Sequence, residues 1–106
     1  MHAATLYQLM ADPKMDLFVG LAPDEWTQAR KMIIDMILAT EMGRHFDLLG
    51  RFRVKALSNQ EINLSEEADK LFVLSIILKC SDLGHSAKAT ELHVKWSKRV
   101  CEEFFA

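Results

Sequence analysis

The chain has 106 residues, half of them apolar and about a quarter charged, so it is long enough for one domain or a piece of one and is not disordered by composition. The formal charge is −2 and no basic stripe with interleaved aromatic residues occurs, so nucleic acid is not expected as a partner. The longest apolar run, residues 71–78, is too short for a bilayer, and no signal peptide precedes Lys14. No membrane span is therefore expected, and a cytoplasmic location is predicted.

The first half of the chain has apolar residues at helical spacing and no strand alternation. Pro13 is expected to end the first helix, because the residue before a proline avoids helical angles. Pro23 suits the first turn of the next helix, where its missing N–H needs no partner. Gly43 is expected to bend or interrupt that helix. The predicted segments are a helix over 2–11, a turn or short helix over 15–21, a helix over 23–42 and a continuation over 44–57.

The second half predicts a loop over 58–63 and then two more helices. Asn63 or Ser65 is expected to cap the first of them, and Asn63 with Glu66 has the spacing of a capping box. That helix is apolar on nearly every side over 71–78, which is typical of the central helix of a bundle, and it is expected to end at Gly84. Ser86 is expected to cap the last helix, over 87–105. The sequence therefore predicts an all-α helical bundle.

The two cysteines, Cys80 and Cys101, both lie inside apolar helical patterns. We interpret them as two reduced, packed thiols of a cytosolic protein, with one disulfide as the alternative. No C-x-x-C pair occurs, so a zinc ribbon or finger is not expected. Nucleophile and phosphate-binding motifs such as G-x-S-x-G, the P-loop and H-E-x-x-H are also missing from the sequence.

Asp82 is the polar residue that most needs explaining, because it follows the apolar helix. A buried carboxylate is costly unless it is paired, hydrogen-bonded, protonated or bound to a metal, and the C-terminal end of a helix disfavours an anion. A metal cation would remove both problems. The residues alone favour plainer alternatives, namely a surface position or a salt bridge to Lys79 or Lys88.

The histidines admit similar alternatives. His85 would share a helix face with Asp82 if the helix continued, but one Asp and one His are weak support for zinc, and a loop histidine near a cap is favoured. Glu41 and His45 are four residues apart and would share one face of a helix. They are interpreted either as a solvent-facing pair or as a polar patch that faces the same cavity as Asp82. His93, among charged residues, is interpreted as a surface residue.

Two long stretches are more distinctive than these single residues. "RKMIIDMILATEMGRHFDLL" (residues 30–49) is similar to the helix R-K-M-V-I-D-M-V-L-A-T-D-M-S-K-H of the class I cyclic nucleotide phosphodiesterases. "ILKCSDLGHSAKATELHVKWSKRVCEEFF" (residues 77–105) resembles that family's C-A-D-L-S-N-P or S-H-P-A-K segment and the following helix, which carries the pattern W-x-x-x-(x)-x-E-E-F-F. The loop and apolar helix between them fall in the family's order. The resemblance covers essentially the whole chain and implies the C-terminal portion of the all-α phosphodiesterase (HD-superfamily) catalytic domain.

The resemblance implies roles for five residues. Asp82 matches the family Asp that directly ligates a tightly bound zinc. Thr40 matches a Thr near the hydration shell of the second metal, usually magnesium or manganese, and Met42 matches a Met that lines the substrate pocket. Glu41 replaces the usual Asp, which keeps the charge, adds a methylene and leaves its role open. His85 stands where some members point an Asn toward the base and others carry His.

The resemblance further implies that residues 1–106 form a single partial catalytic domain. The family's catalytic histidine and the other three ligands of its zinc lie upstream, and the purine-binding glutamine lies downstream, so no catalytic residue is expected within this chain. The implied reaction is hydrolysis of the 3′ phosphoester bond of cAMP or cGMP to the 5′-nucleotide, with Zn²⁺ and Mg²⁺ or Mn²⁺ in the complete domain. The isolated chain is expected to be inactive and to self-associate through exposed apolar surface. The alternative is a non-catalytic helical interaction module or a degenerate phosphodiesterase-like module.

Overall fold

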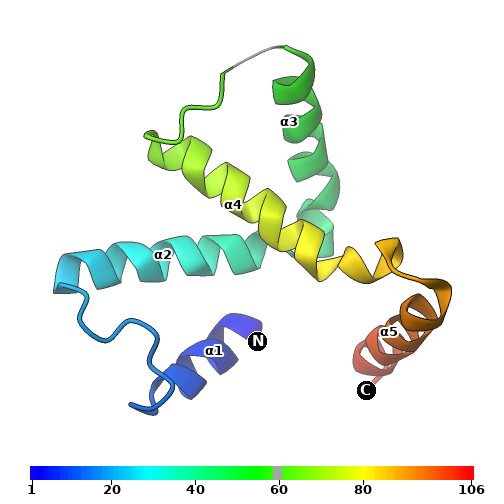
Figure 1. Cartoon of the computed structure of the whole chain (residues 1–106), viewed down its shortest axis with the longest axis horizontal. Helices are drawn as coiled ribbons and strands as arrows, with labels where there is room; N and C mark the ends of the chain where they lie inside the picture. Colours follow the sequence, from blue (N-terminus) through cyan, green and yellow to red (C-terminus); the bar gives the residue numbers. More distant parts are fainter. Residues whose placement is uncertain (59–60) are drawn as a thin grey trace.

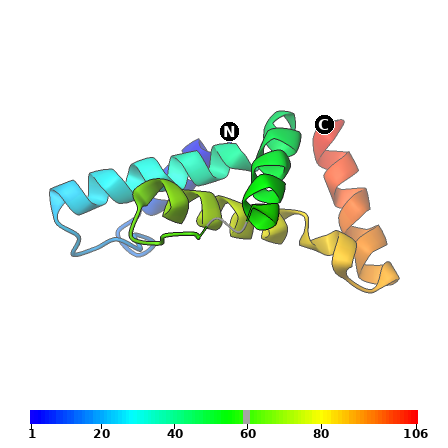
Figure 2. The same cartoon turned by 90° about the horizontal axis from the view of Figure 1, so that it is seen from above.

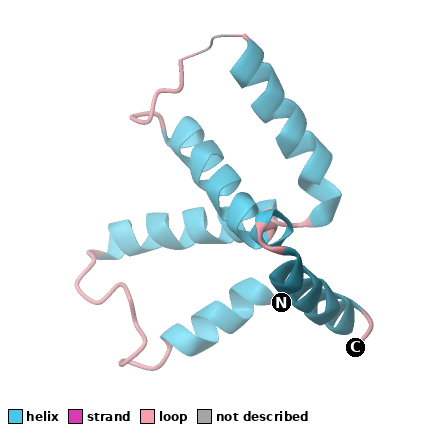
Figure 3. Cartoon of the chain, turned by 45° about the vertical axis from the view of Figure 1, so that its right-hand side comes forward, coloured by secondary structure: helices cyan, strands magenta, loops and turns pink. Residues whose placement is uncertain are grey.

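The computed structural model describes residues 1–58 and 61–106, and within these ranges the chain consists of helices and turns without a strand (Figures 1 and 3). The all-α prediction is therefore confirmed. The elements in chain order are α1 (His2–Met10), α2 (Pro23–Ala39), the 3₁₀ turn η1 (Met42–Arg44), α3 (His45–Leu57), α4 (Glu67–Asp82), the 3₁₀ turn η2 (Gly84–Ala87) and α5 (Thr90–Phe104).

The first half of the chain follows the predicted order closely. Residues 15–21 form turns rather than a helix, and Gly20 has φ +99°, a backbone conformation that glycine adopts at little cost. Helix α2 begins at Pro23, and the Glu25 carboxylate accepts a hydrogen bond of 2.9 Å from the Ala22 N–H. The helix ends three residues before the predicted position 42. Gly43 lies within η1, which confirms the predicted interruption.

The predicted cap of α4 is wrong. The Asn63 side chain accepts a hydrogen bond of 3.0 Å from the Ser65 N–H and so closes a local turn, and α4 begins only after Glu66. The structure places neither Asn63 nor Ser65 at the capping position, and the Asn63 and Glu66 capping box does not form. Residues 59–60 of the predicted loop lie outside the described residues.

The end of α4 and the start of α5 also differ from prediction. Helix α4 ends at Asp82, two residues before Gly84, which opens η2. Ser86 lies inside η2 and donates a hydrogen bond of 2.8 Å to the Leu83 carbonyl, so it cannot cap α5. The last helix instead begins at Thr90, after an extended Ala89.

Helix α4 is the centre of the molecule, as predicted. It crosses the C-terminal end of α2, whereas α1 lies beside α2 and α5 packs mainly on η2 at the periphery (Figures 1 and 2). Of the four buried residues among those described, Phe72, Ser75 and Lys79 lie on α4 and Leu48 lies on α3. The only sizeable intramolecular core described is therefore the crossing of α2, α3 and α4.

Many large apolar side chains stay exposed. The radius of gyration is 16.4 Å, against about 13 Å for a compact domain of this length. The accessible surface is 8557 Å², against roughly 6,000 Å² for a compact monomer of this mass. The predicted exposure of apolar surface is confirmed. No helix in the described ranges combines the length and the apolar character needed to cross a bilayer.

Both cysteines are free and both are exposed. The interpretation as free thiols is confirmed, but the expectation that they are packed is wrong. Each lies on a helix face that no other described element covers.

Candidate functional site

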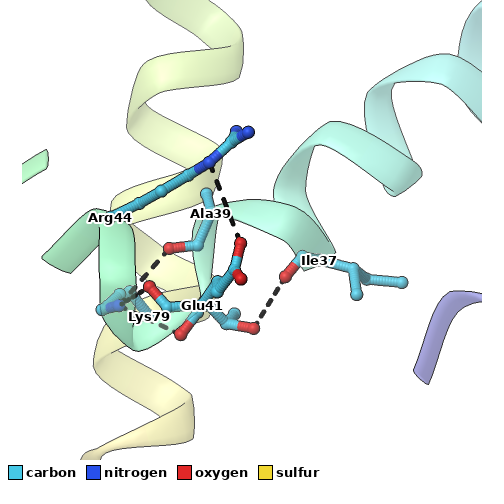
Figure 4. A network of polar contacts seen from close by, with 6 residues as sticks. Ile37, Ala39, Glu41, Arg44 and Lys79 are labelled. Carbon is cyan, nitrogen blue, oxygen red and sulfur yellow. Dashed lines mark hydrogen bonds and ion pairs between the residues drawn. The ribbon is translucent and has the colours of Figure 1, made fainter. Parts of the chain in front are cut away.

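The crossing of α2 and α4 is organised by one buried lysine. The Lys79 ammonium donates hydrogen bonds to the carbonyls of Ala39 (3.4 Å), Thr40 (3.0 Å) and Glu41 (3.2 Å), all at the C-terminal end of α2 (Figure 4). Carbonyls at the end of a helix lack helical partners, and the negative end of the helix dipole favours a cation. Lys79 therefore holds the end of α2 against α4.

Thr40 and Glu41, two of the residues for which the resemblance implies a place near the site, lie in the segment that Lys79 holds. Thr40 is half-buried, and its hydroxyl donates a hydrogen bond of 2.7 Å to the Ile37 carbonyl. The Glu41 carboxylate is exposed and lies 3.9 Å from the Arg44 Nε atom, so the predicted pairing of Glu41 with His45 is replaced by a pairing with Arg44 (Figure 4). The physical reason is that α2 ends at Ala39, so residues 41 and 45 do not share one continuous helix.

Met42, the third residue of this group, opens η1 and is exposed. The Glu41 carbonyl accepts hydrogen bonds both from Lys79 and from the Arg44 N–H, at 3.1 Å for the latter. These bonds fix the backbone on either side of Met42. The side chain itself faces solvent in this chain.

Asp82 is the last residue of α4, one helical turn after Lys79, and it is exposed. Within the described residues its carboxylate has no hydrogen bond and no ion pair. The surface position is therefore the alternative that holds, and the salt bridges to Lys79 and Lys88 do not form. Lys79 is occupied by the carbonyls of α2, which explains why it does not reach Asp82.

His85 lies in η2 and packs against His93 of α5. The two rings stack with centroids 5.1 Å apart and an interplanar angle of 10°, and the two Nδ1 atoms are 3.1 Å apart. One of these nitrogens donates the hydrogen bond and the other accepts it, with the roles set by the tautomers of the two rings. His93 is half-buried, so its interpretation as a surface residue is wrong; it fastens η2 to α5.

The described residues fit one metal ligand and not a complete metal site. The Asp82 carboxylate has oxygen atoms of the kind that bind zinc and magnesium. Across residues 1–58 and 61–106, however, no three side chains of His, Cys, Asp or Glu come together in a way that could hold an ion. A metal at Asp82 would need its other ligands from outside these residues.

Lys79 is the residue that the sequence analysis missed. The sequence patterns indicate it only as a salt-bridge partner of Asp82. Its signal was present, because it is the one charged residue in the apolar run from Leu71 to Cys80. A charge in that position must find buried acceptors, and helix-end carbonyls are such acceptors.

The comparison with known proteins covers the whole chain. A family model described as 3′5′-cyclic nucleotide phosphodiesterase matches residues 1–106. The chain is 35% identical over 104 residues to the dual specificity calcium/calmodulin-dependent 3′,5′-cyclic nucleotide phosphodiesterase 1B of Bos taurus, covering 98% of this chain and 18% of that protein. It is 33% identical over 105 residues to the cGMP-inhibited 3′,5′-cyclic phosphodiesterase 3A of Mus musculus, covering 98% of this chain and 9% of that protein. The chain thus spans less than a fifth of the length of these relatives, and by its full-length match it belongs to the 3′,5′-cyclic nucleotide phosphodiesterase family.

Proposed function

We propose that this chain works as part of a larger catalytic domain that hydrolyses the 3′ phosphoester bond of cAMP, cGMP or both to give the 5′-nucleotide. The observation that carries the proposal is the family match over residues 1–106, which includes both sequence clusters singled out above. The relatives named above are cyclic nucleotide phosphodiesterases by name. Because the chain spans 18% of the bovine relative, the remaining catalytic groups must come from other parts of the domain.

In this proposal Asp82 is one metal ligand of the complete domain. Its carboxylate is exposed at the end of a helix that the Lys79 contacts anchor, and it has no partner among the described residues. Zinc, with magnesium or manganese as the second ion, would lower the pKa of bound water and stabilise charge on the phosphoryl oxygens. The chain's own part is to present one negatively charged oxygen ligand from a fixed helix end.

Four further residues are proposed to lie near the metal ions or the substrate in the same region. Thr40, Glu41 and Met42 follow α2 directly, in the segment that Lys79 holds. His85 follows Asp82 by three residues and is held by its stacking on His93. These contacts support a pocket wall built from the end of α2 on one side and η2 on the other.

A chimaera tests this function directly. The matching segment of the bovine 1B relative is replaced by residues 1–106, and hydrolysis of cAMP and cGMP is measured together with bound zinc. We expect the chimaera to hydrolyse cyclic nucleotide. We expect Asp82→Asn to lower kcat/KM by at least about 100-fold and to reduce the bound zinc, since removing one ligand charge weakens a metal site.

The matched control is Asp24→Asn, which removes the same charge from an exposed carboxylate in the first turn of α2. It is expected to leave activity and zinc content unchanged. A folded chimaera without hydrolytic activity would refute the proposed function. An active chimaera whose zinc and rate survive Asp82→Asn would refute the ligand assignment alone.

The exposed apolar surface supports a second candidate, a non-catalytic helical interaction module or a degenerate phosphodiesterase-like module. A chimaera that folds but has no hydrolytic activity would favour this second candidate. A cytoplasmic location is part of the proposal in either case, and its support is the pair of free thiols at Cys80 and Cys101.

A further inference from the structure

Lys79 is the most deeply buried charged side chain of the described residues, with 6% of its surface exposed. Lysine is almost never buried without partners, because the ammonium loses its hydration. In residues 1–58 and 61–106 no carboxylate lies within ion-pair distance of it. Its burial therefore depends on the three carbonyl contacts at the end of α2.

The backbone hydrogen bonds at the end of α2 leave the carbonyls of Ala39 and Thr40 for the lysine, whereas the Glu41 carbonyl is shared with the Arg44 N–H. The Ile37 carbonyl accepts from the Thr40 N–H at 3.1 Å, and the Leu38 carbonyl accepts from the Glu41 N–H at 3.2 Å. The next three carbonyls in the chain, those of residues 39, 40 and 41, converge on the Lys79 Nζ atom (Figure 4). An ammonium has three N–H donors, so the number of donors equals the number of carbonyls.

We propose that Lys79 is a positioning residue, which sets the Thr40–Met42 segment at a fixed place relative to the end of α4 that carries Asp82. Lys79 and Asp82 lie three residues apart on one helix, so the spacing of their backbones is set by helix geometry, and the three carbonyl contacts fix the ammonium. The ammonium in turn holds the backbone of Thr40 and Glu41. The catalytic part of this inference rests on the proposed function, whereas the geometric part does not.

The inference requires both the charge and the three donors of Lys79. Methionine at this position keeps the length and fills the space, but it removes the donor from the Ala39 and Thr40 carbonyls and leaves the Glu41 carbonyl with the Arg44 N–H alone. Arginine keeps the charge at the negative end of the helix dipole, but its planar group cannot direct three N–H bonds from one atom. We therefore expect the end of α2 to be held most firmly in wild type, less firmly in Lys79→Arg and least firmly in Lys79→Met.

Hydrogen exchange in the 106-residue chain tests the geometric part without reference to catalysis. The amides of Thr40, Glu41 and Arg44 close the end of α2 and η1. In Lys79→Met we expect these amides to exchange at least about tenfold faster, since a hydrogen bond to a charged group contributes more than an ordinary one. Lys70→Met is the matched control, because Lys70 is exposed on the same helix.

Kinetics of the chimaera test the catalytic part. We expect Lys79→Met to lower kcat by about 100-fold while KM changes little, since small misplacements of site residues act mainly on the reacting geometry. Lys79→Arg should restore part of kcat, and Lys70→Met should resemble wild type. Thermal melting of each variant separates a loss of rate from a loss of folded protein.

Three outcomes overturn the proposal. Unchanged exchange at Thr40, Glu41 and Arg44 in Lys79→Met would remove the geometric part. A folded Lys79→Met chimaera with wild-type kcat would remove the catalytic part. If Lys79→Arg and Lys79→Met lowered kcat equally, and in line with their loss of melting temperature, Lys79 would be only a stabilising contact. Inactivity of the unsubstituted chimaera, in contrast, counts against the proposed function and not against the exchange result.

Discussion

Lys55 and Asp69 join α3 to α4 by an ammonium–carboxylate contact of 2.7 Å, and both side chains are largely shielded, with 23% and 20% of their surface exposed. The second Asp69 oxygen accepts a hydrogen bond of 3.0 Å from the Asn63 N–H. The hydrogen bond from Lys55, and then that from Asn63, hold the pKa of Asp69 below its ordinary value of 3.8. One carboxylate thus fastens both helices and the turn between them.

This pair makes stability depend on pH in a defined direction. The pKa of Asp69 is lower in the folded chain than in the unfolded one, so folding favours the ionised form. The contribution is fully present above pH 3.8 and is lost as the pH falls below that value through the folded pKa. Urea midpoints followed by circular dichroism should fall over this range in wild type. The midpoint of Asp69→Asn should be lower at neutral pH and should fall less as the pH is lowered. An identical pH dependence in both chains would contradict the prediction.

At the scale of elements, the N-terminus of α2 has half of a capping box. Glu25 accepts from the Ala22 N–H, but Ala22 has no side-chain oxygen to accept from the Glu25 N–H. Ala22 has extended angles, φ −62° and ψ 154°, that serine adopts readily. We expect Ala22→Ser to raise the free energy of unfolding by roughly 1 kcal/mol.

The measurement is the denaturant midpoint, with Ala56→Ser as control. Ala56 is exposed in the last turn of α3, where serine gains no cap and is a slightly poorer helix former than alanine. A stabilisation of the same size in both variants would show that the gain at Ala22 does not come from capping.

The order and type of the elements could be predicted from sequence because they depend on local chemistry. Pro23 starts α2 since its ring fits a first turn, and Gly43 falls at the break before α3. The predicted helix caps are wrong because Asn63 and Ser86 each have several nearby backbone partners. Asn63 binds the N–H of Ser65, and Ser86 binds the carbonyl of Leu83, choices that sequence spacing does not distinguish.

The candidate site was predictable only in part. Asp82 was identified by its position after an apolar helix and by resemblance, and its exposure agrees with the plain surface alternative. The apolar run around Lys79 shows that its charge needs buried acceptors, but the sequence does not show that these acceptors lie about 40 positions earlier in the chain. The stacking of His85 on His93 was missed because it depends on the turn between α4 and α5.

At the scale of the molecule, apolar surface remains for a partner or for the rest of a domain. The excess of this chain over a compact monomer is about 2,500 Å², which exceeds the roughly 800 Å² that each partner buries in a standard interface. Large apolar side chains on α3 and at the end of α5 contribute to it, among them Phe46 at 80% exposure and Phe104 at 73%. We expect the purified 106-residue chain to associate as its concentration rises.

Sedimentation velocity over a range of concentrations measures this association. Phe46→Ser together with Phe104→Ser should weaken it, since both side chains are exposed and removing them deletes apolar surface. Gln8→Ser, an exposed polar change on α1, is the control. A monodisperse monomer with a sharp melting transition would contradict the expectation.

The Lys79 contact also has a consequence for the order of folding. It joins groups 38 to 40 residues apart, whereas most of the other described hydrogen bonds close within a few residues. Local helices form fast, and closing a long loop costs entropy before the contact is made. The ammonium can leave water only when the carbonyls at the end of α2 are already in place. The helices should therefore form first, and the desolvation of one lysine should mark the late step at which α2 and α4 become a single unit.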